Sequence, residues 1–289
     1  YILGVVAELW RFEDLRNGFN LLIDGDLPSG AGVSSSAALC VGTAYALADL
    51  DPANVDSARW WLARRGRDVV AAALLVEVLP FRPCFAMGET EALAQVFRDG
   101  IRETRLIVAA PPPARLAVEA TYRFERCDVM RRMAVDAATF RPRRTHRVTR
   151  LGPQHLRDVV DLYGDASRSY FTTERLEREI YFGIYVDDQL VSGAGTHVRS
   201  REAGLAAVGN VLTRMPHRDR GMATSVTSAV TEAALEEHRD VVLNVREDNV
   251  PAIPVYERLG YRTHGTFIEG PAVRRAPWER ITKGIWRRT

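Results

Sequence analysis

The pattern of apolar and polar residues is most regular in the second half of the chain. Alternating or short continuous apolar runs predict five strands there. They cover residues 146–151, 181–186, 189–198, 204–213 and 241–246. In the last of these, Val241, Leu243 and Val245 fall on one side of the strand. This alternation is typical of a strand with one buried face.

Three further segments in this half carry the period of an amphipathic helix. The first two are residues 152–166 and 220–238, and in the second of these apolar or small residues recur at 222, 226, 229, 230 and 233. Residues 249–260 predict a third helix with Pro251 in its first turn, where a missing N–H costs nothing. Pro254 follows where the unsatisfied first-turn donors run out, so we expect a local distortion there.

The first half of the chain is less regular. Short helical patterns cover residues 56–79 and 88–100, and a strand is predicted at 104–110. The basic segment 140–147 predicts an exposed connector. These changes in texture divide the chain into three segments, residues 1–50, 51–144 and 145–289.

Composition excludes several classes of protein. A chain of 289 residues with 46% apolar residues predicts one large or two ordinary folded domains, and a net charge of +2 does not indicate a nucleic-acid partner. The longest apolar run, residues 69–79, is too short to cross a membrane. Cys40, Cys84 and Cys127 show neither zinc-ligand nor disulfide spacing, so we expect reduced thiols, no metal site and a cytoplasmic protein.

A loop near the N-terminus has the residues that grip phosphate. Gly30 and Gly32 let backbone N–H groups approach an anion closely, and an alanine-rich helix pattern follows with its positive end toward the loop. Three serines can cap that helix or hydrogen-bond phosphate oxygens, namely Ser34, Ser35 and Ser36. A glycine-rich turn that only caps a buried helix explains this composition equally well.

The order of residues in this region is more specific than its composition. Residues 1–50 resemble the middle of the N-terminal domain of galactokinases, in the GHMP kinase superfamily. The resemblance implies an ATP-phosphate loop over residues 28–37. The family's catalytic aspartate segment and its glycine-rich third motif have no counterpart downstream, and phosphoryl transfer needs all its parts at once. We therefore interpret this segment as a kinase fragment, and a galactokinase-type sugar kinase is kept as an alternative function.

A second anion-binding pattern lies between a predicted strand and the helix predicted at 220–238. The run R-D-R-G-M-A begins at Arg218, and Gly221 allows the backbone to wrap closely around an anion while Ala223 keeps the first helical turn thin. Successive N–H groups as far as Thr224 can then cradle a diphosphate at the helix N-terminus. Arg218 and Arg220 can add charge, although exposed arginines are common in this chain.

A second motif follows the strand predicted at 241–246. Asn249 and Tyr256 are seven residues apart, which is two helical turns, so they share a helix face and can point into one cleft. The complete pattern is N-x-x-A-x-x-x-Y-x-x-x-G-Y. Its members are Asn249, Ala252, Tyr256, Gly260 and Tyr261.

In this order and spacing, the two motifs resemble the GNAT acetyltransferase superfamily over residues 146–270. The resemblance implies an α/β (mixed α+β) fold with a mixed, mostly antiparallel sheet flanked by helices, and a helical or α/β lobe before it. Residues 51–144 are expected to be a degenerate GNAT-like partner lobe. The implied cofactor is acetyl-CoA. Its implied binding residues are Val211, Leu212, Thr213, Arg218, Arg220, Gly221, Met222, Ala223, Thr224 and Asn249.

The resemblance also implies a mechanism, direct transfer of the acetyl group to a primary amine. It places Tyr256 beside the sulfur as the acid, and a backbone N–H near Leu212 is the candidate donor to the developing oxyanion. The base is not assigned: His197, Glu202 and His217 are each explained better as solvated surface residues, and a water relay is a further alternative. The acceptor is a small-molecule or peptide amine, and a non-catalytic acyl-CoA-binding module is a further alternative.

Overall fold

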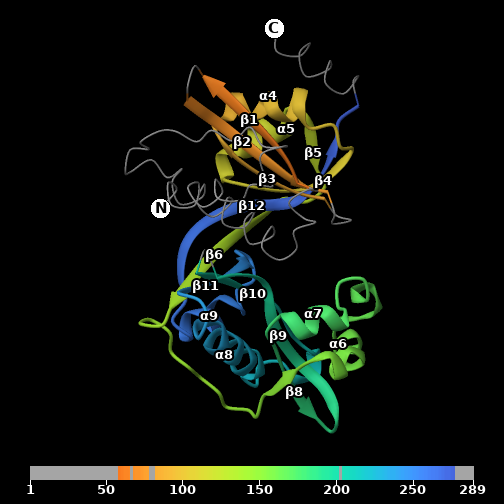
Figure 1. Ribbon diagram of the computed structural model, residues 1–289, viewed down its shortest axis with the longest axis vertical. Coiled ribbons are helices and arrows are strands. Elements are labelled where there is room, and N and C mark those ends of the chain that lie inside the picture. The colour runs from red at the N-terminus through yellow and green to blue at the C-terminus, as the bar shows by residue number, and fades with distance from the viewer. Residues whose placement is uncertain (1–57, 66–67, 78–81, 202–203, 277–289) are drawn as a thin grey trace. The chain divides into compact units, whose positions relative to one another are not determined.

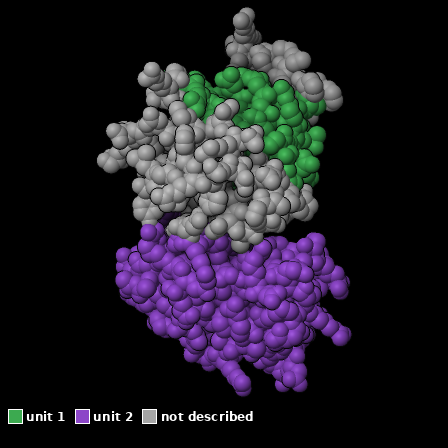
Figure 2. Space-filling view, viewed as in Figure 1, with its two compact units in different colours: residues 1–129, 266–289 green, residues 130–265 purple. Residues whose placement is uncertain are grey.

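The computed structural model describes residues 58–65, 68–77, 82–201 and 204–276. The chain forms two compact units (Figure 2). Unit 1 comprises residues 1–129 and 266–289, and unit 2 comprises Met130–Gly265. The chain passes from unit 1 to unit 2 after Val129 and returns after Gly265.

Unit 2 is built on a mixed sheet in the order β6-β11-β10-β9-β8-β7. Its strands are β6 (Asp128–Asp136), β7 (Thr149–Leu151), β8 (Tyr181–Val186), β9 (Gln189–Ser200), β10 (Leu205–Thr213) and β11 (Asp240–Arg246). All neighbours are antiparallel except β10 and β11, which are parallel. A single parallel pair inside an antiparallel sheet requires a long crossover, and helix α8 supplies it.

Helices cover both faces of this sheet (Figure 1). Helices α6 (Leu156–Tyr163) and α7 (Thr173–Arg178) pack on one face in an aromatic-rich core. Helices α8 (Met222–Leu235) and α9 (Ile253–Arg258) pack on the other, where Val226 and Val230 meet Val241, Leu243 and Val245. The two apolar faces explain why the central strands carry few exposed residues.

In unit 1 the strands pair in the order β1-β2-β3-β4-β12, with β5 also paired to β12. The strands are β1 (Ala58–Arg65), β2 (Asp68–Val76), β3 (Pro83–Gly88), β4 (Arg105–Ala110), β5 (Tyr122–Phe124) and β12 (Arg262–Arg274). Helix α4 (Thr90–Gln95), which runs on into a π-helical turn at Val96–Gly100, and helix α5 (Arg115–Glu119) contribute to its main core.

The helical pattern predicted at 56–79 is wrong, because the structure forms the hairpin β1–β2 there. The apolar run of β2 is buried on both faces of the sheet: Ala71, Ala73 and Leu75 belong to one core, and Leu74 and Val76 to another. A continuous apolar run of this kind has no period that separates strand from helix. The ladders of β2 with β1 and β3, rather than the period of its apolar residues, identify the run as a strand.

The other predicted elements are confirmed within a few residues. The strands at 104–110, 181–186, 189–198, 204–213 and 241–246 and the helices at 88–100 and 220–238 are present, and the strand at 146–151 is shorter. The predicted helix at 152–166 is α6 flanked by short 3-10 turns. The third helix begins at Ile253, so Pro254 rather than Pro251 occupies its first turn. Pro251 lies in the preceding turn, which the Ala252 N–H closes onto the Asn249 carbonyl at 3.0 Å.

The connector 140–147 has no regular structure, and most of it is exposed, as predicted. It runs along helix α8, where the Arg143 N–H donates to Ser228 Oγ at 2.9 Å and the Thr145 N–H to Ser225 Oγ at 3.1 Å. Polar side chains on a buried helix face therefore hold this segment. In the described part of the chain, no helix is long and apolar enough to span a membrane.

Candidate functional site

The two parallel strands of unit 2 separate near the middle of the sheet. Strands β10 and β11 pair only from Leu205 to Val208 on β10 and from Asp240 to Leu243 on β11. Beyond that point β10 continues to Thr213, paired to β9 alone. An opening between two parallel strands leaves backbone groups on its inner edges for a ligand.

A bulge in β10 accompanies this separation. The β9–β10 register shifts between Gly209 and Leu212, and Asn210 has a φ of +52°. Left-handed backbone is uncommon for a residue other than glycine, and asparagine tolerates it best. The bulge therefore turns the last residues of β10 at the point where β11 leaves it.

The end of β10 holds three of the predicted binding residues. Thr213 is buried, and its hydroxyl lies 2.8 Å from Ser192 Oγ, which also donates to the Leu212 carbonyl at 3.2 Å. The Arg214 N–H donates to the Val191 carbonyl on β9 at 2.8 Å. Because N–H direction alternates along a strand, the N–H groups of Val211 and Thr213 point away from β9, and that of Leu212 points toward it.

A short loop joins β10 to helix α8. Arg218 Nε donates to the Thr213 carbonyl at 3.0 Å, which closes the loop onto the end of the strand. Asp219 and Gly221 both have positive φ, of +60° and +79°. Arg220 is exposed. The structure thus assigns the Arg218 side chain a bond within the loop, whereas that of Arg220 extends into solvent.

The N-terminus of α8 lacks a side-chain cap. Gly221 is the N-cap residue, and the Ser225 N–H makes the first helical bond, to the Gly221 carbonyl at 3.1 Å. The N–H groups of Met222, Ala223 and Thr224 precede that bond, so the helix itself does not satisfy them. The Met222 side chain is buried in the core, so only its backbone can serve a ligand. A Cβ atom at Gly221 would lie 3.2 Å from Thr145 Oγ1, so the connector packs closely against this turn.

Tyr256 lies on α9 and packs in the core on the α8 face. Its ring meets that of Tyr261 edge-on, with centroids 6.2 Å apart, and burial raises the pKa of its hydroxyl to about 12. No described residue hydrogen-bonds that hydroxyl, whereas the Tyr261 hydroxyl lies 2.7 Å from Thr231 Oγ1. Asn249 is exposed in the turn before the helix, so Asn249 and Tyr256 are not on one continuous helix.

The pattern analysis missed a group of side chains around the bulge. Asn210 Nδ2 donates to the hydroxyls of Tyr181 at 3.0 Å and Tyr170 at 3.2 Å, and the Tyr163 hydroxyl donates to the Asn210 carbonyl. The dipeptide Gly209-Asn210 inside a predicted strand is the signal that could have located it, since glycine and asparagine there favour a bulge.

The three side chains considered as a base differ in position. His197 is half-buried rather than solvated: it packs against Gly209, where a Cβ would lie 2.5 Å from its Nδ1. Burial, and then the charge of Arg175, lower its pKa to about 4. His217 lies in the β10–α8 loop with a buried Nδ1 that has no described partner. Glu202 lies outside the described residues, as do the predicted phosphate-loop residues Gly30, Gly32, Ser34, Ser35 and Ser36.

Two family models match separate parts of the chain. Residues 181–267 match the model of FR47-like proteins, which covers β8 to β12, including the bulge, the loop and Tyr256. Residues 1–74 match the N-terminal domain of GHMP kinases, which confirms the resemblance of the N-terminal segment. Among curated proteins, none matches the chain significantly.

Solved structures share the fold. A GCN5-related N-acetyltransferase from Kribbella flavida superimposes with a TM-score of 0.57 at 17% identity, over 86% of this chain and 97% of that one. A GNAT-family acetyltransferase from Colwellia psychrerythraea gives a TM-score of 0.52 at 12% identity, over 78% and 96% of the two chains. The described chain therefore has the mixed α/β fold of GNAT acetyltransferases, as the sequence predicted.

Proposed function

We propose that the protein is an acetyl-CoA-dependent N-acetyltransferase that acts on a primary amine. The observation that carries the proposal is the separation of β10 and β11 after Val208 and Leu243, directly beside an uncapped helix N-terminus. One opening presents strand-edge backbone groups, and the adjacent turn presents successive N–H groups suited to a diphosphate. Both features lie in the segment matched by the FR47-like family model.

The residues present fit coenzyme A. The Gly221 turn and the N–H groups of Met222 to Thr224 would hold the diphosphate, with the exposed Arg220 adding charge. The exposed edge of β10 would hold the pantetheine arm through the backbone of Val211 and Thr213. Asn249, which is exposed in the turn after β11, would contact the coenzyme through its side chain.

Acetyl-CoA supplies an acetyl thioester, and this chain's residues position it and move protons. As the new N–C bond forms and the C–S bond breaks, the amine loses one proton and the departing sulfur gains one. The N–H groups of Val211 and Thr213 would stabilise negative charge on the acetyl oxygen. The Tyr256 hydroxyl is protonated at neutral pH, as an ordinary tyrosine is, and burial raises its pKa further, so it holds a proton that it can donate to sulfur.

We also propose that unit 1 is a GNAT-like partner lobe. Its sheet repeats the pairing order of unit 2: β1–β2 and β2–β3 antiparallel, β3–β4 parallel, then an antiparallel closing strand. In unit 2 the same sequence is β8–β9, β9–β10, β10–β11 and β11–β6. In each unit a helix follows the third strand of this series.

Calorimetric titration of the whole protein with acetyl-CoA, and separately with Mg-ATP, tests the function. We expect micromolar affinity for acetyl-CoA and none for ATP. A matched pair of variants, Gly221→Asp and Gly221→Asn, adds the same volume at a left-handed position that both residues tolerate. Only the aspartate places a negative charge at the diphosphate, so it should lose far more affinity. Binding of ATP but not acetyl-CoA would overturn the proposal in favour of a kinase.

A further inference from the structure

An arginine on the α6–α7 side of the unit 2 sheet has no acidic partner. Arg175 lies on α7 and is half-buried. Its guanidinium stacks 4.1 Å from the centroid of the Tyr170 ring, and Nη1 donates to the Tyr170 hydroxyl at 3.2 Å. Among the described residues no carboxylate pairs with it. Most of its five N–H donors are therefore available to a ligand.

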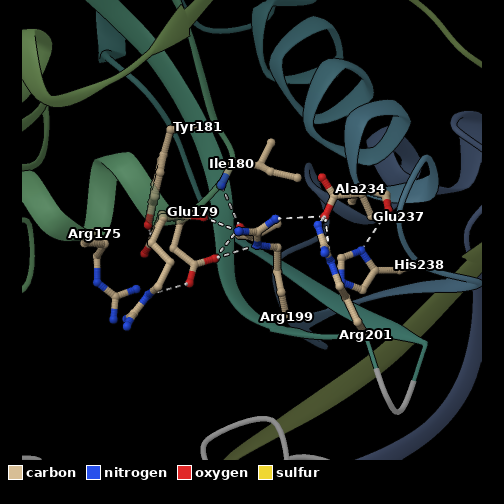
Figure 3. Close-up of polar contacts among 12 residues, drawn as sticks. Arg175, Glu179, Ile180, Tyr181, Arg199, Arg201, Ala234, Glu237 and His238 are labelled. Atoms are coloured by element: carbon tan, nitrogen blue, oxygen red, sulfur yellow. Dashed lines mark hydrogen bonds and ion pairs between the residues drawn. The ribbon is translucent and has the colours of Figure 1, made fainter. Parts of the chain in front are cut away.

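The buried carboxylate nearest to Arg175 in sequence is already used. Glu179 ends the same helix and is completely buried. One of its oxygens accepts a hydrogen bond from Thr196 Oγ1 at 2.7 Å and pairs with Arg199 Nε at 3.4 Å. Figure 3 shows this group continuing from Arg199 to Glu237, 3.6 Å apart. The Glu179 carboxylate is held by Thr196 and Arg199 on β9 and by the neighbouring Arg178, and among the described residues no ion pair joins it to Arg175.

Arg175 is tied to the bulge in β10 through Tyr170. The Tyr170 hydroxyl accepts both the Arg175 donor and the Asn210 amide, which also holds Tyr181. Asn210 is the left-handed residue at the bulge, directly before Val211. Arg175 is therefore linked, through Tyr170, to the residue directly before Val211, whose backbone would contact the coenzyme.

A second polar side chain faces the same place from β9. His197 packs against Gly209, the residue that precedes Asn210 and follows the last β10–β11 pair. Its imidazole has no hydrogen-bond partner among the described residues. Burial, and to a lesser extent the charge of Arg175, lower the pKa of His197 to about 4, so the imidazole is neutral at physiological pH. A neutral imidazole offers one lone pair and one N–H.

We infer that the acceptor is an amino acid, an amine that carries a carboxylate next to its nitrogen, with Arg175 binding the carboxylate and His197 accepting a hydrogen bond from the nitrogen. This inference rests on the proposed function and names its substrate class. Guanidinium and carboxylate match as a planar, two-bonded pair, which an uncharged amide or a simple amine cannot form. The guanidinium of Arg175 thus fits the carboxylate of an amino acid, and the neutral imidazole of His197 fits its ammonium group.

The test uses product-like probes, so that it does not depend on turnover. N-acetyl-L-leucine, N-acetyl-L-methionine and N-acetyl-L-phenylalanine are each titrated against the whole protein by calorimetry, with and without coenzyme A, beside their primary amides. We expect at least one acid to bind at least tenfold more tightly than its amide. Equal affinity within every acid–amide pair, or no binding by any acid, would overturn the inference.

Variants identify the responsible side chain. Arg175→Met keeps a long side chain over Tyr170 and removes the charge, and should abolish the preference for acids while leaving amide binding unchanged. Arg175→Lys should keep part of the preference for acids, because the positive charge remains but the planar pair of N–H donors that matches a carboxylate is lost. Arg168→Met is the control, since Arg168 is exposed and paired with Asp165 at 2.8 Å. If Arg175→Met still prefers acids over amides, Arg175 is not the residue that binds the carboxylate.

The titrations distinguish a failure of the acetyltransferase proposal from a failure of the amino-acid acceptor. If acetyl-CoA does not bind but the acids do and respond to Arg175, the carboxylate site stands and the acetyltransferase proposal falls. If acetyl-CoA binds and the acids and amides are equivalent, the acetyltransferase proposal stands and the amino-acid acceptor falls. Thermal melting of each variant in the same buffer confirms that it is folded before either conclusion is drawn.

Discussion

Arg218 Nε donates to the Thr213 carbonyl at 3.0 Å, and so joins the last residue of β10 to the loop that follows it. The bond spans five residues and closes the turn before the N-terminus of α8. It holds the strand edge and the helix N-terminus in one fixed arrangement. The R-x-x-G-x-A pattern therefore contributes a loop clamp as well as charge.

We expect Arg218→Met to weaken acetyl-CoA binding by about tenfold, because the clamp and a charge are both lost, which corresponds to about 1.4 kcal/mol. Arg220→Met is the matched comparison, since Arg220 is exposed and its loss removes charge alone. It should cost about twofold at low salt, and that cost should shrink as salt is added, because a purely electrostatic attraction is screened. Titrations with acetyl-CoA at two ionic strengths measure the affinity of each variant and its dependence on salt. Equal losses of affinity in the two variants would show that the Arg218–Thr213 hydrogen bond does not contribute to binding.

Removing the Tyr256 hydroxyl should lower turnover by about 100-fold at neutral pH, the scale expected for a proton donor. Acetyl-CoA affinity should stay within about twofold, because the ring keeps its packing against Tyr261. Steady-state rates and calorimetry of Tyr256→Phe measure the two quantities. An unchanged rate would remove Tyr256 from the mechanism.

Tyr261→Phe provides the opposite pattern and serves as its control. The Tyr261 hydroxyl is buried and bonded to Thr231 at 2.7 Å, so its removal should cost about 1 kcal/mol of unfolding free energy. Turnover should be nearly unchanged. Urea unfolding of both tyrosine variants distinguishes the structural hydroxyl from the one proposed to act in catalysis.

Asn210 combines a left-handed backbone with two side-chain hydrogen bonds to tyrosine hydroxyls. Asn210→Ala loses both and strains the backbone, so we expect about 2–3 kcal/mol of destabilisation. Asn210→Gly relieves the backbone and should cost about 1–2 kcal/mol. If the alanine variant is no less stable than the glycine variant in urea unfolding, the left-handed conformation is not present in solution.

The depressed pKa of His197 links the stability of the fold to pH. Its ordinary pKa is about 6.5 and its folded value about 4, so the unfolded chain binds a proton at pH 5 that the folded chain does not. His197 should therefore remove up to about 2 kcal/mol of unfolding free energy between pH 7 and pH 5. In His197→Gln that part of the acid sensitivity should disappear. Urea unfolding at the two pH values measures it, and an equal pH response in both proteins would show that the imidazole titrates normally.

The connector provides a test by proteolysis. The Arg143 N–H donates to Ser228 Oγ, and the segment from Arg141 to Arg147 is rich in trypsin sites. Ser228→Ala removes that acceptor and should speed limited cleavage within the connector several-fold, at a cost of about 1 kcal/mol. Ala233→Ser, on the same helix, serves as the control. Equal cleavage rates in the wild type and in Ser228→Ala would show that the serine does not hold the connector.

Much of unit 2 follows from local pattern. Its strands alternate or form short apolar runs, and α8 keeps one apolar face, so each element can be placed without knowing its neighbours. The loop before α8 can also be predicted locally, because Gly221 directly precedes the first residue of the helix. The spacing within one motif predicts the position of Tyr256 on a helix. That helix begins at Ile253, later than predicted, with Pro254 in its first turn.

Other features depend on contacts between distant parts of the chain. The hairpin β1–β2 pairs with β3, and the apolar run of β2 serves two faces at once. The group around Asn210 joins α6, the segment before α7, β8 and β10, so no window of the sequence contains it. Arg175 and His197 look like ordinary exposed residues until their neighbours are known, because burial and an absent partner are properties of the folded chain.

Strands β6 and β12 each begin in one compact unit and continue in the other. The sheet of unit 1 is closed by β12, which comes after α9 in the chain, and the sheet of unit 2 is closed by β6, which comes before all its other strands. A cut between β5 and β6 therefore leaves every strand of unit 2 in one piece, whereas a piece that ends after β5 lacks β12 and so lacks part of the sheet of unit 1. Truncation can therefore isolate unit 2 but not unit 1, because a fragment that stops before unit 2 would leave the edge of β4 without the strand that pairs with it.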